Sequence, residues 1–161
     1  MFGELTAEET ICHLIVTSKL ENCIFNIPNP FDENNDIALY VNLNTNTKNK
    51  VEFINNSPYI TSTVKLDARV LSANKETDFF EADNLELIES YANSFIKDKI
   101  ETYLYKTAKN YKADIDSFGK YAVHHFMTWN NWSDYNWLEN YTNSFFDVDV
   151  NVNVISSFLI S

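Results

Sequence analysis

The sequence predicts a single α+β domain, in which an antiparallel β-sheet of about four to five strands carries its helices mainly on one face. Three observations support this fold class. Alternating apolar residues mark strands, apolar residues at helical spacing mark helices, and these segments follow the order α-β-β-β-β-α-α-α-β. The chain of 161 residues, with only 2 Gly and 3 Pro, is also typical of one ordered domain, which we place at residues 3–161.

The first half of the chain predicts one helix and four strands. Thr6 and Glu9 have the spacing of a capping box, so we expect a helix from about Ala7 to Ser18. The strands that follow have apolar residues at alternate positions, namely Cys23, Phe25 and Ile27, then Ile37, Leu39, Val41 and Leu43, then Val51 and Phe53, then Val64, Leu66, Ala68 and Val70. This alternation indicates one buried sheet face, and the short connections favour a meander of neighbouring antiparallel strands.

The second half predicts three helices. Asp83 and Glu86 are expected to cap a long helix that runs from Leu85 to Asn110. Its apolar stripe consists of Leu85, Ile88, Ala92, Phe95, Ile96, Tyr103 and Leu104. Asp114 is expected to cap the next helix, in which Gly119 would permit close approach of a neighbouring backbone. Ser133 is expected to cap the last helix.

The inward face of the Asp114-capped helix is expected to carry Ile115, Phe118, Ala122 and Phe126. In the last helix, Trp132 and Trp137 occupy the positions of a hydrophobic staple. A strand from Asp147 to Ile160 then closes the chain, and we expect it to pair with an earlier strand. Its apolar face is formed by Val148, Val150, Val152, Val154, Phe158 and Ile160, opposite Asp147, Asp149, Asn151 and Asn153.

Composition excludes some classes of partner. The formal charge of -11 argues against nucleic acid and against an anionic membrane surface, which both attract clustered Lys and Arg. No apolar run is long enough for a membrane span. Cys12 and Cys23 lack the spacing of a redox or zinc motif; they are expected to be ordinary core or surface residues, with a disulfide as the alternative.

Motifs for catalysis and metal binding are weak. No G-x-S-x-G elbow is present, and two glycines leave no phosphate-binding loop. The Asp32–Asp36 loop lacks the Gly and Glu of a calcium site, and the adjacent His124 and His125 point apart on a helix. Asp147 and Asp149 are weak cation candidates. We therefore predict no catalytic, cofactor-binding or metal residues. The alternative is a pair of carboxylates for glycoside hydrolysis, which the sequence does not exclude because it contains 23 acidic residues.

An aromatic cluster between residues 126 and 146 is the remaining candidate site. Its candidate contact residues are Trp129, Trp132, Tyr135 and Trp137. Trp and Tyr supply large contact areas at low entropic cost, so an exposed part of this cluster would suit a protein partner. The alternatives are a core patch and a small-molecule pocket.

Several of these features together resemble the carboxy-terminal domain of the Ger(x)C family, the lipoprotein C subunits of bacterial spore germinant receptors. The resemblance rests on Gly3–Glu9, the Lys112–Tyr121 stretch, the tryptophans Trp129, Trp132 and Trp137, and the final strand. Thr6, Glu9, Asp114, Phe118 and Gly119 are its structural motif residues. Two departures are Phe158, where Gly is expected, and the lack of Pro in the Phe126–Trp129 segment.

The resemblance implies a non-enzymatic component of a germinant receptor, acting in nutrient-triggered germination through assembly with the membrane-embedded A and B subunits. It also implies a lipid anchor and further domains upstream of this chain, and a location at the outer face of the spore inner membrane. This domain alone is expected to be a monomer without cofactor. The alternatives are an extracytoplasmic small-ligand-binding domain or hydrolase of a low-GC bacterium (Firmicutes), and a structural spore protein.

Overall fold

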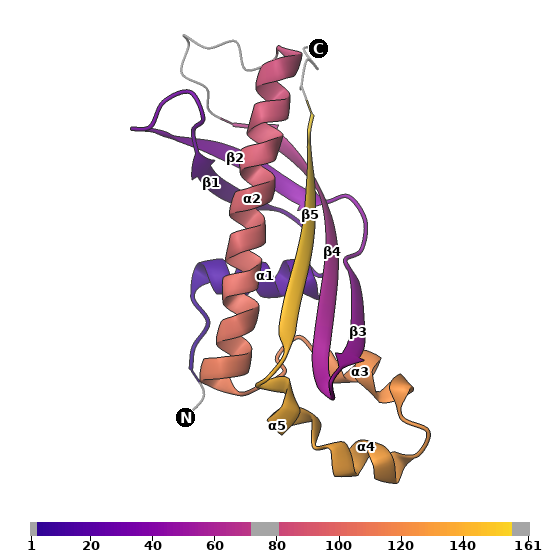
Figure 1. The fold of residues 1–161 in the computed structure, drawn as a ribbon. Coiled ribbons are helices and arrows are strands. Elements are labelled where there is room, and N and C mark those ends of the chain that lie inside the picture. The colour runs from indigo at the N-terminus through magenta and orange to yellow at the C-terminus, as the bar shows by residue number, and fades with distance from the viewer. Residues whose placement is uncertain (1–2, 72–80, 156–161) are drawn as a thin grey trace.

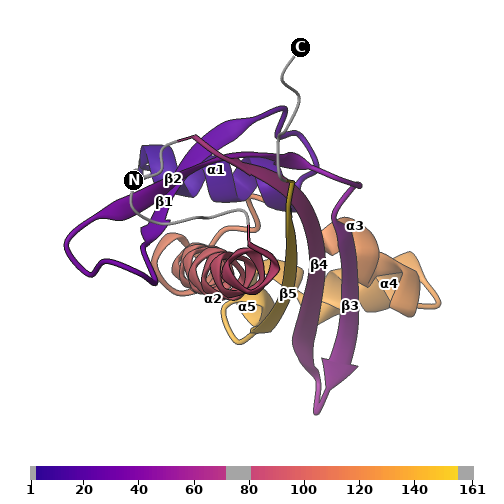
Figure 2. The ribbon, with the colours of Figure 1, turned by 90° about the horizontal axis from the view of Figure 1, so that it is seen from above.

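A computed structural model describes residues 3–71 and 81–155, and Figure 1 shows their arrangement. A curled five-stranded sheet curves around one side of a long helix, the amino-terminal helix packs against that long helix, and the short helices of the second half lie at one end (Figures 1 and 2). The elements in order are α1 (Ala7–Val16), β1 (Cys23–Pro28), β2 (Asp36–Leu43), β3 (Lys48–Ile54), β4 (Ser57–Val70), α2 (Ala82–Lys106), the π-helix η1 (Thr107–Tyr111), α3 (Gly119–Ala122), the 3₁₀ helix η2 (Val123–His125), α4 (Trp129–Tyr135), α5 (Trp137–Tyr141) and β5 (Phe145–Val154). The predicted α+β class and order are confirmed, with α4 and α5 in place of one predicted helix.

The sheet is mixed, which corrects the prediction of a purely antiparallel sheet. Strand β4 is central: β2 and β3 pair antiparallel with successive parts of one edge, and β5 pairs parallel along the other. Strand β1 pairs with β2. The meander prediction is confirmed for β1 with β2 and for β3 with β4, but it is wrong for β2 and β3, which lie end to end along β4. Parallel pairing needs a long crossover, and the connection from β4 to β5, which contains α2 to α5, provides it.

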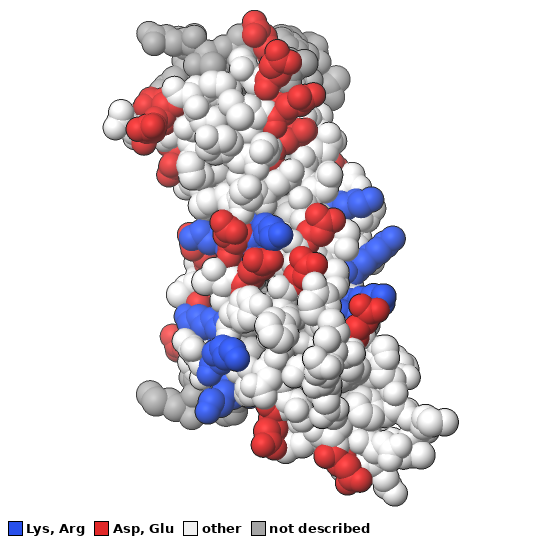
Figure 3. All heavy atoms as spheres, in the orientation of Figure 1, with Lys and Arg blue, Asp and Glu red and all other residues white. Residues whose placement is uncertain are grey.

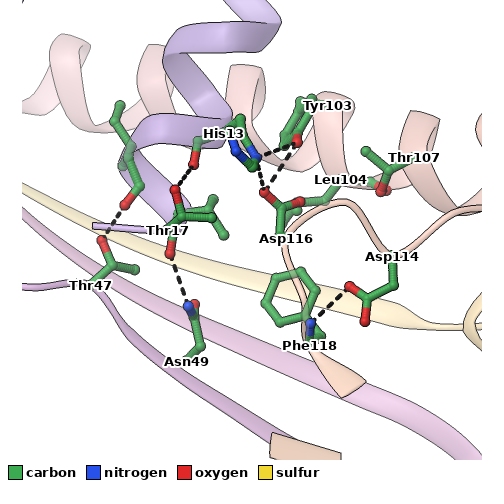
Figure 4. Close-up of polar contacts among 12 residues, drawn as sticks. His13, Thr17, Thr47, Asn49, Tyr103, Leu104, Thr107, Asp114, Asp116 and Phe118 are labelled. Atoms are coloured by element: carbon green, nitrogen blue, oxygen red, sulfur yellow. Dashed lines mark hydrogen bonds and ion pairs between the residues drawn. The ribbon is translucent and has the colours of Figure 1, made fainter. Parts of the chain in front are cut away.

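The break between β2 and β3 lies where α1 ends. The Thr47 hydroxyl donates to the carbonyl of Ile15 at 2.6 Å, and the Asn49 amide donates to the carbonyl of Val16 at 2.9 Å (Figure 4). The last carbonyls of a helix have no partner within the helix. Thr47 and Asn49, at the break between β2 and β3, therefore hold the carboxyl end of α1 against the sheet.

One face of α2 forms the centre of the core. The side chains at four-residue intervals are fully buried, namely Ile88, Ala92, Ile96, Ile100 and Leu104. This confirms most of the predicted stripe, although Leu85 and Phe95 are only partly buried. The predicted cap is wrong: α2 begins at Ala82 after Glu81, and Asp83 lies inside the first turn. Its carboxylate still suits the positive end of the helix dipole.

A second face of α2 covers the free edge of β5. Backbone N–H groups of β5 donate to side chains of α2, in the pairs Phe146 to Tyr105 at 3.3 Å, Val148 to Glu101 at 3.3 Å, Val152 to Asn93 at 2.7 Å and Val154 to Glu89 at 2.8 Å. The spacing of the acceptors along α2 matches the spacing of the N–H donors along β5, because four helical residues rise about 6 Å and two strand residues about 6.6 Å. The acceptors on α2 thus take the place of a further strand.

Strand β5 confirms the predicted alternation. Its buried residues are Phe146, Val148, Val150, Val152 and Val154, and its exposed ones include Asp147, Asp149, Asn151 and Asn153. On the outer face, the Tyr59 hydroxyl donates to Asp147 at 3.2 Å. Phe158 and Ile160, which were predicted to continue this strand, lie outside the described residues.

Candidate interaction surface

The chain between α2 and β5 gathers at one end of the molecule, beside β3 and β4 (Figure 1). Asp114 organises this segment. Its carboxylate accepts the backbone N–H of Phe118 at 2.8 Å and of Gly119 at 2.7 Å, and the indole N–H of Trp137 at 2.9 Å. The predicted cap position is wrong, because Phe118 is the N-cap of α3 and Ile115 lies outside the helix, but the Asp114 carboxylate still binds N–H groups at the start of α3.

Gly119 lets the Trp137 indole lie against the start of α3. A Cβ atom at Gly119 would lie 2.9 Å from Trp137 Nε1, a distance at which one of the two groups must move. The predicted reason for the glycine is therefore corrected, because the close neighbour is a side chain and not a backbone. The same indole bonds to Asp114, so the glycine and the aspartate hold one tryptophan.

Phe118 connects this segment to the core. Its side chain is fully buried, and its ring lies 6.4 Å from the ring of Tyr141 and 6.2 Å from that of Phe146. The Tyr141 hydroxyl in turn lies 2.8 Å from the Thr107 hydroxyl, at the start of η1. Burying both hydroxyls is tolerated because they satisfy each other.

A series of aromatic rings continues outward from Trp137. Trp132 stacks on Trp137 with ring centres 5.8 Å apart, and Phe126 lies 5.3 Å from Trp132. Phe126 also meets Phe53 of β3 edge-to-face at 5.5 Å. The Tyr135 hydroxyl donates to the backbone carbonyl of Asn56, in the β3–β4 turn, at 2.8 Å. These contacts hold α4 against the hairpin.

The helix boundaries in this segment differ from the prediction. Thr128 is the N-cap of α4 and accepts the Asn131 N–H at 3.1 Å, whereas Ser133 lies within α4. Asn136 adopts the left-handed conformation (φ 52°) and separates α4 from α5. Asn tolerates this conformation better than most residues, so it could have served as a sequence signal. Trp132 and Trp137 do stack, but across two helices.

The four predicted contact residues differ in exposure. Trp129 is 74% exposed, Trp132 and Tyr135 are half-buried, and Trp137 is only 8% exposed. Trp137 is therefore a buried support on which Trp132 packs. Met127, which no sequence pattern singled out, is 95% exposed two residues before Trp129. We define the aromatic surface as Met127, Trp129, Trp132 and Tyr135.

The aromatic surface lies in a nearly uncharged part of an acidic protein. Residues 121–146 contain no Lys or Arg and two acidic residues, Asp134 and Glu139. Figure 3 shows few charged side chains at this end of the molecule, over α4 and α5. A partner would therefore meet an apolar, neutral surface.

Comparison with known families identifies the chain. Residues 1–157 match the family described as "Spore germination B3/ GerAC like, C-terminal". The chain belongs to this family. The match confirms the resemblance that the motif residues indicated, and it covers all the described residues. No curated protein matches the chain.

Among solved structures, the crystal structure of the GerBC protein is similar to this one. The TM-score is 0.76 at 17% sequence identity, over 96% of this chain. The likeness covers 47% of the GerBC chain, so this chain spans about half the length of that protein. At this identity the comparison shows a shared fold.

The Thr6–Glu9 segment links α1 to α2. Thr6 and Glu9 form the predicted capping box, with bonds of 3.2 Å and 2.9 Å. Glu9 also binds Lys106, and Glu8 pairs with Lys99 at 2.9 Å. Burial opposes ionisation of Glu9, but the bonds from Lys106 and the Thr6 backbone outweigh it, so its pKa is lowered. Glu9 therefore ties α1 to α2 through Lys106.

A polar cluster that the sequence did not reveal joins three segments (Figure 4). His13 Nδ1 of α1 lies 2.8 Å from Asp116 Oδ1, and the Tyr103 hydroxyl of α2 donates to the same oxygen at 3.1 Å. Asp116 Oδ2 is buried and has no hydrogen-bond partner among the described residues. Burial raises the pKa of Asp116, against the effect of His13 and Tyr103. No motif spacing could find this cluster, because His13 and Asp116 are 103 residues apart.

The raised pKa of Asp116 predicts a pH-dependent stability. Its folded-state pKa lies above its ordinary value of 3.8, so the folded chain binds this proton more tightly than the unfolded chain. The contribution to stability is fully present below the unfolded pKa and is lost as the pH rises through the folded pKa. We expect Asp116→Asn to remove it.

The measurement is urea unfolding of both proteins from about pH 3 to about pH 7. The free energy of unfolding of the natural protein minus that of Asp116→Asn should fall as the pH rises. Shifted groups that do not contact Asp116, such as Glu9, are common to both proteins and cancel. A difference that stays constant over this range would contradict the prediction.

Cys12 and Cys23 are free, so the disulfide alternative is not realised. Burial raises the pKa of Cys12 to about 12 and that of Cys23 to about 11, which keeps both thiols protonated at neutral pH. Within residues 3–71 and 81–155, no group of three or more His, Cys, Asp or Glu is placed to hold a metal ion. His124 and His125 are both exposed.

Among the helices that the structure describes, none has the length and hydropathy needed to cross a membrane.

Proposed function

We propose that this chain is the carboxy-terminal domain of a germinant receptor C subunit, and that it acts by docking to other subunits through the aromatic surface. Family membership supports the link to spore germination. The 74% exposure of Trp129 is the observation that supports docking. Tryptophan is enriched at the centres of protein interfaces, and Met127 beside it adds adaptable apolar area.

The rigidity of the support favours this use of the surface. Trp137 is held by Asp114 at 2.9 Å, and Trp132 stacks on Trp137. The Tyr135 bond to Asn56 then fixes α4 to the β3–β4 turn. A surface that is ordered before binding loses less conformational entropy on association, which strengthens binding.

The proposed partners are the integral-membrane A and B subunits at the outer face of the spore inner membrane. The neutral aromatic surface suits an apolar partner, and the net charge of -11 opposes close contact with anionic lipid. A lipid anchor elsewhere in the protein would then provide the attachment to the membrane. In this proposal the domain takes no nucleic acid, performs no catalysis and is a monomer on its own.

The test uses the full-length C subunit with the paired substitutions Met127→Ser and Trp129→Ala. Loss of a central tryptophan weakens binding by about 2 kcal/mol or more, which is about 30-fold. We therefore expect less A and B subunit to co-purify, and slower germination on nutrient. Both quantities are compared at equal C subunit levels, measured by immunoblot.

The matched control is Ile24→Ala on β1, which removes a side chain of 56% exposure away from the aromatic surface. It should leave assembly and germination unchanged. Normal co-purification and normal germination of the Met127/Trp129 variant would contradict the proposal. A normal nutrient response after deletion of the whole gene would instead favour a structural role in the spore.

A further inference from the structure

A groove follows α2 on the side that faces away from β5. One part, of about 540 Å³, lies between α1 and α2, and an adjoining part of about 310 Å³ lies between α2 and the end of β1. Phe95 and Asp98 line both parts, which join them into one groove. The residues that α2 contributes are Ser90, Tyr91, Ser94, Phe95, Asp98, Lys99, Thr102 and Tyr103.

The dimensions and spacing of the groove suit a helix. Residues 90–103 of α2 extend over about 20 Å, which is three to four helical turns. Tyr91, Phe95, Asp98 and Thr102 are separated by four, three and four residues, the spacing of a helix seam that packs against a second helix. Leu87, one turn before Tyr91, is 39% exposed and extends the apolar surface.

The floor of the groove is largely buried and mainly apolar. Cys12 of α1 and Tyr103 of α2 are each 2% exposed, and Phe95 is partly buried against the core. Ser90 and Ser94 are small, which leaves room beside Tyr91 for a side chain from a partner. The groove therefore offers a place for apolar side chains that residues 3–71 and 81–155 do not fill.

The rim of the groove is acidic. Glu8, Glu9 and Asp98 line it with one cation, Lys99. Lys99 already pairs with Glu8, and Glu9 pairs with Lys106. Among the described residues, Asp98 forms no ion pair, so the groove has an uncompensated carboxylate between its two parts.

We propose that this groove binds an amphipathic helix of a partner protein, with apolar residues between α1 and α2 and a Lys or Arg paired with Asp98. Laying the apolar face of a helix into a groove is a common mode of recognition. Charge complementarity specifies a basic helix, because the groove and the whole domain are acidic. This site is separate from the aromatic surface, so it stands if the proposed function fails.

The probe is a synthetic helical peptide of about 18 residues, with leucine on one face and lysine on the other. A second peptide carries glutamate in place of lysine. Binding is measured by fluorescence anisotropy of the labelled peptide. The contact surface is mapped from the amide chemical shifts of the isotope-labelled domain.

The protein variants separate specific from general effects. Tyr91→Ala removes a 42% exposed ring from the groove, so folding is not at risk. Asp98→Lys reverses the charge in the groove, and Glu139→Lys makes the same change in net charge on the exposed surface of α5. We expect Tyr91→Ala and Asp98→Lys each to weaken binding of the lysine peptide about tenfold, and Glu139→Lys by less than about threefold.

The amide shifts should map to α1 and residues 90–103. The proposal is overturned if the lysine peptide does not bind, if both peptides bind equally, or if Glu139→Lys weakens binding as much as Asp98→Lys. Shifts confined to α4 and α5 would also overturn it. A dimer of the free domain that Tyr91→Ala abolishes in sedimentation experiments would place a second copy in the groove instead of a partner helix.

Discussion

Trp137→Ala is expected to lower the free energy of unfolding by about 3 to 5 kcal/mol, whereas Trp129→Ala is expected to change it by less than about 0.5 kcal/mol. The indole of Trp137 is 8% exposed, stacks on Trp132 and donates to Asp114. Its removal would leave a cavity and deprive the Asp114 carboxylate of one donor. Trp129 is 74% exposed and leaves no such cavity.

Urea unfolding of the isolated domain measures both values. Trp137→Phe serves as the matched variant, because it keeps an aromatic ring but removes the N–H that binds Asp114. It should cost less than Trp137→Ala, and its cost should be near that of one charged hydrogen bond, about 1.5 to 3 kcal/mol. Equal stabilities of Trp129→Ala and Trp137→Ala would show that Trp137 does not support the segment.

The sequence placed these tryptophans in one group of candidate contact residues, because residue type alone indicates how well a side chain suits a protein interface. Burial depends on partners that are distant in sequence, such as Asp114, 23 residues before Trp137. The sequence pointed to Asp114 as a partner of backbone N–H groups nearby, since such bonds are local, although the helix begins later than predicted. The bond between the same carboxylate and the Trp137 indole could not be predicted, because the geometry of that bond depends on how α3 and α5 pack.

The strands show the same division between local and distant information. Burial at Ile37, Leu39 and Val41 follows the predicted alternation, because side chains on a strand change face at every residue. The partner of a strand is set by the whole fold. The direction of β5 and the end-to-end placement of β2 and β3 along β4 could therefore not be read from alternation.

Several polar residues gained a role only from the structure. Thr47 and Asn49 were part of a polar stretch in the sequence, yet they bind the last carbonyls of α1. Asp116 was one of 23 acidic residues, and it proves to be buried between α1 and α2. The contacts of these residues with α1 join positions 32, 33 and 103 residues apart, separations at which no local pattern applies.

The two sides of α2 differ in how they meet the curled sheet. Figure 2 shows α2 between β1 and β5. Toward β5, four side chains of α2 bond to the strand, whereas toward β1 the groove beside Tyr91 and Phe95 remains. An uncovered strand edge is a site for pairing with other chains. We infer that the acceptors on α2 protect β5 from such pairing.

Asn93→Leu tests this protection directly. The Asn93 side chain accepts the Val152 N–H at 2.7 Å, and leucine has a similar volume but no acceptor. A backbone N–H left without a partner in a partly buried site costs about 1 to 3 kcal/mol, so the free energy of unfolding should fall by that amount. The Val152 amide should also exchange its hydrogen faster, as measured by NMR in D₂O.

The control Asn93→Asp keeps an acceptor for Val152 and should preserve most of the slow exchange. Because the unprotected edge of β5 offers a free donor, Asn93→Leu should also self-associate at concentrations where Asn93→Asp stays monomeric in sedimentation experiments. If the Val152 amide of Asn93→Leu exchanged as slowly as in the natural protein, then packing against α2, and not the side-chain acceptor, would be what closes this edge.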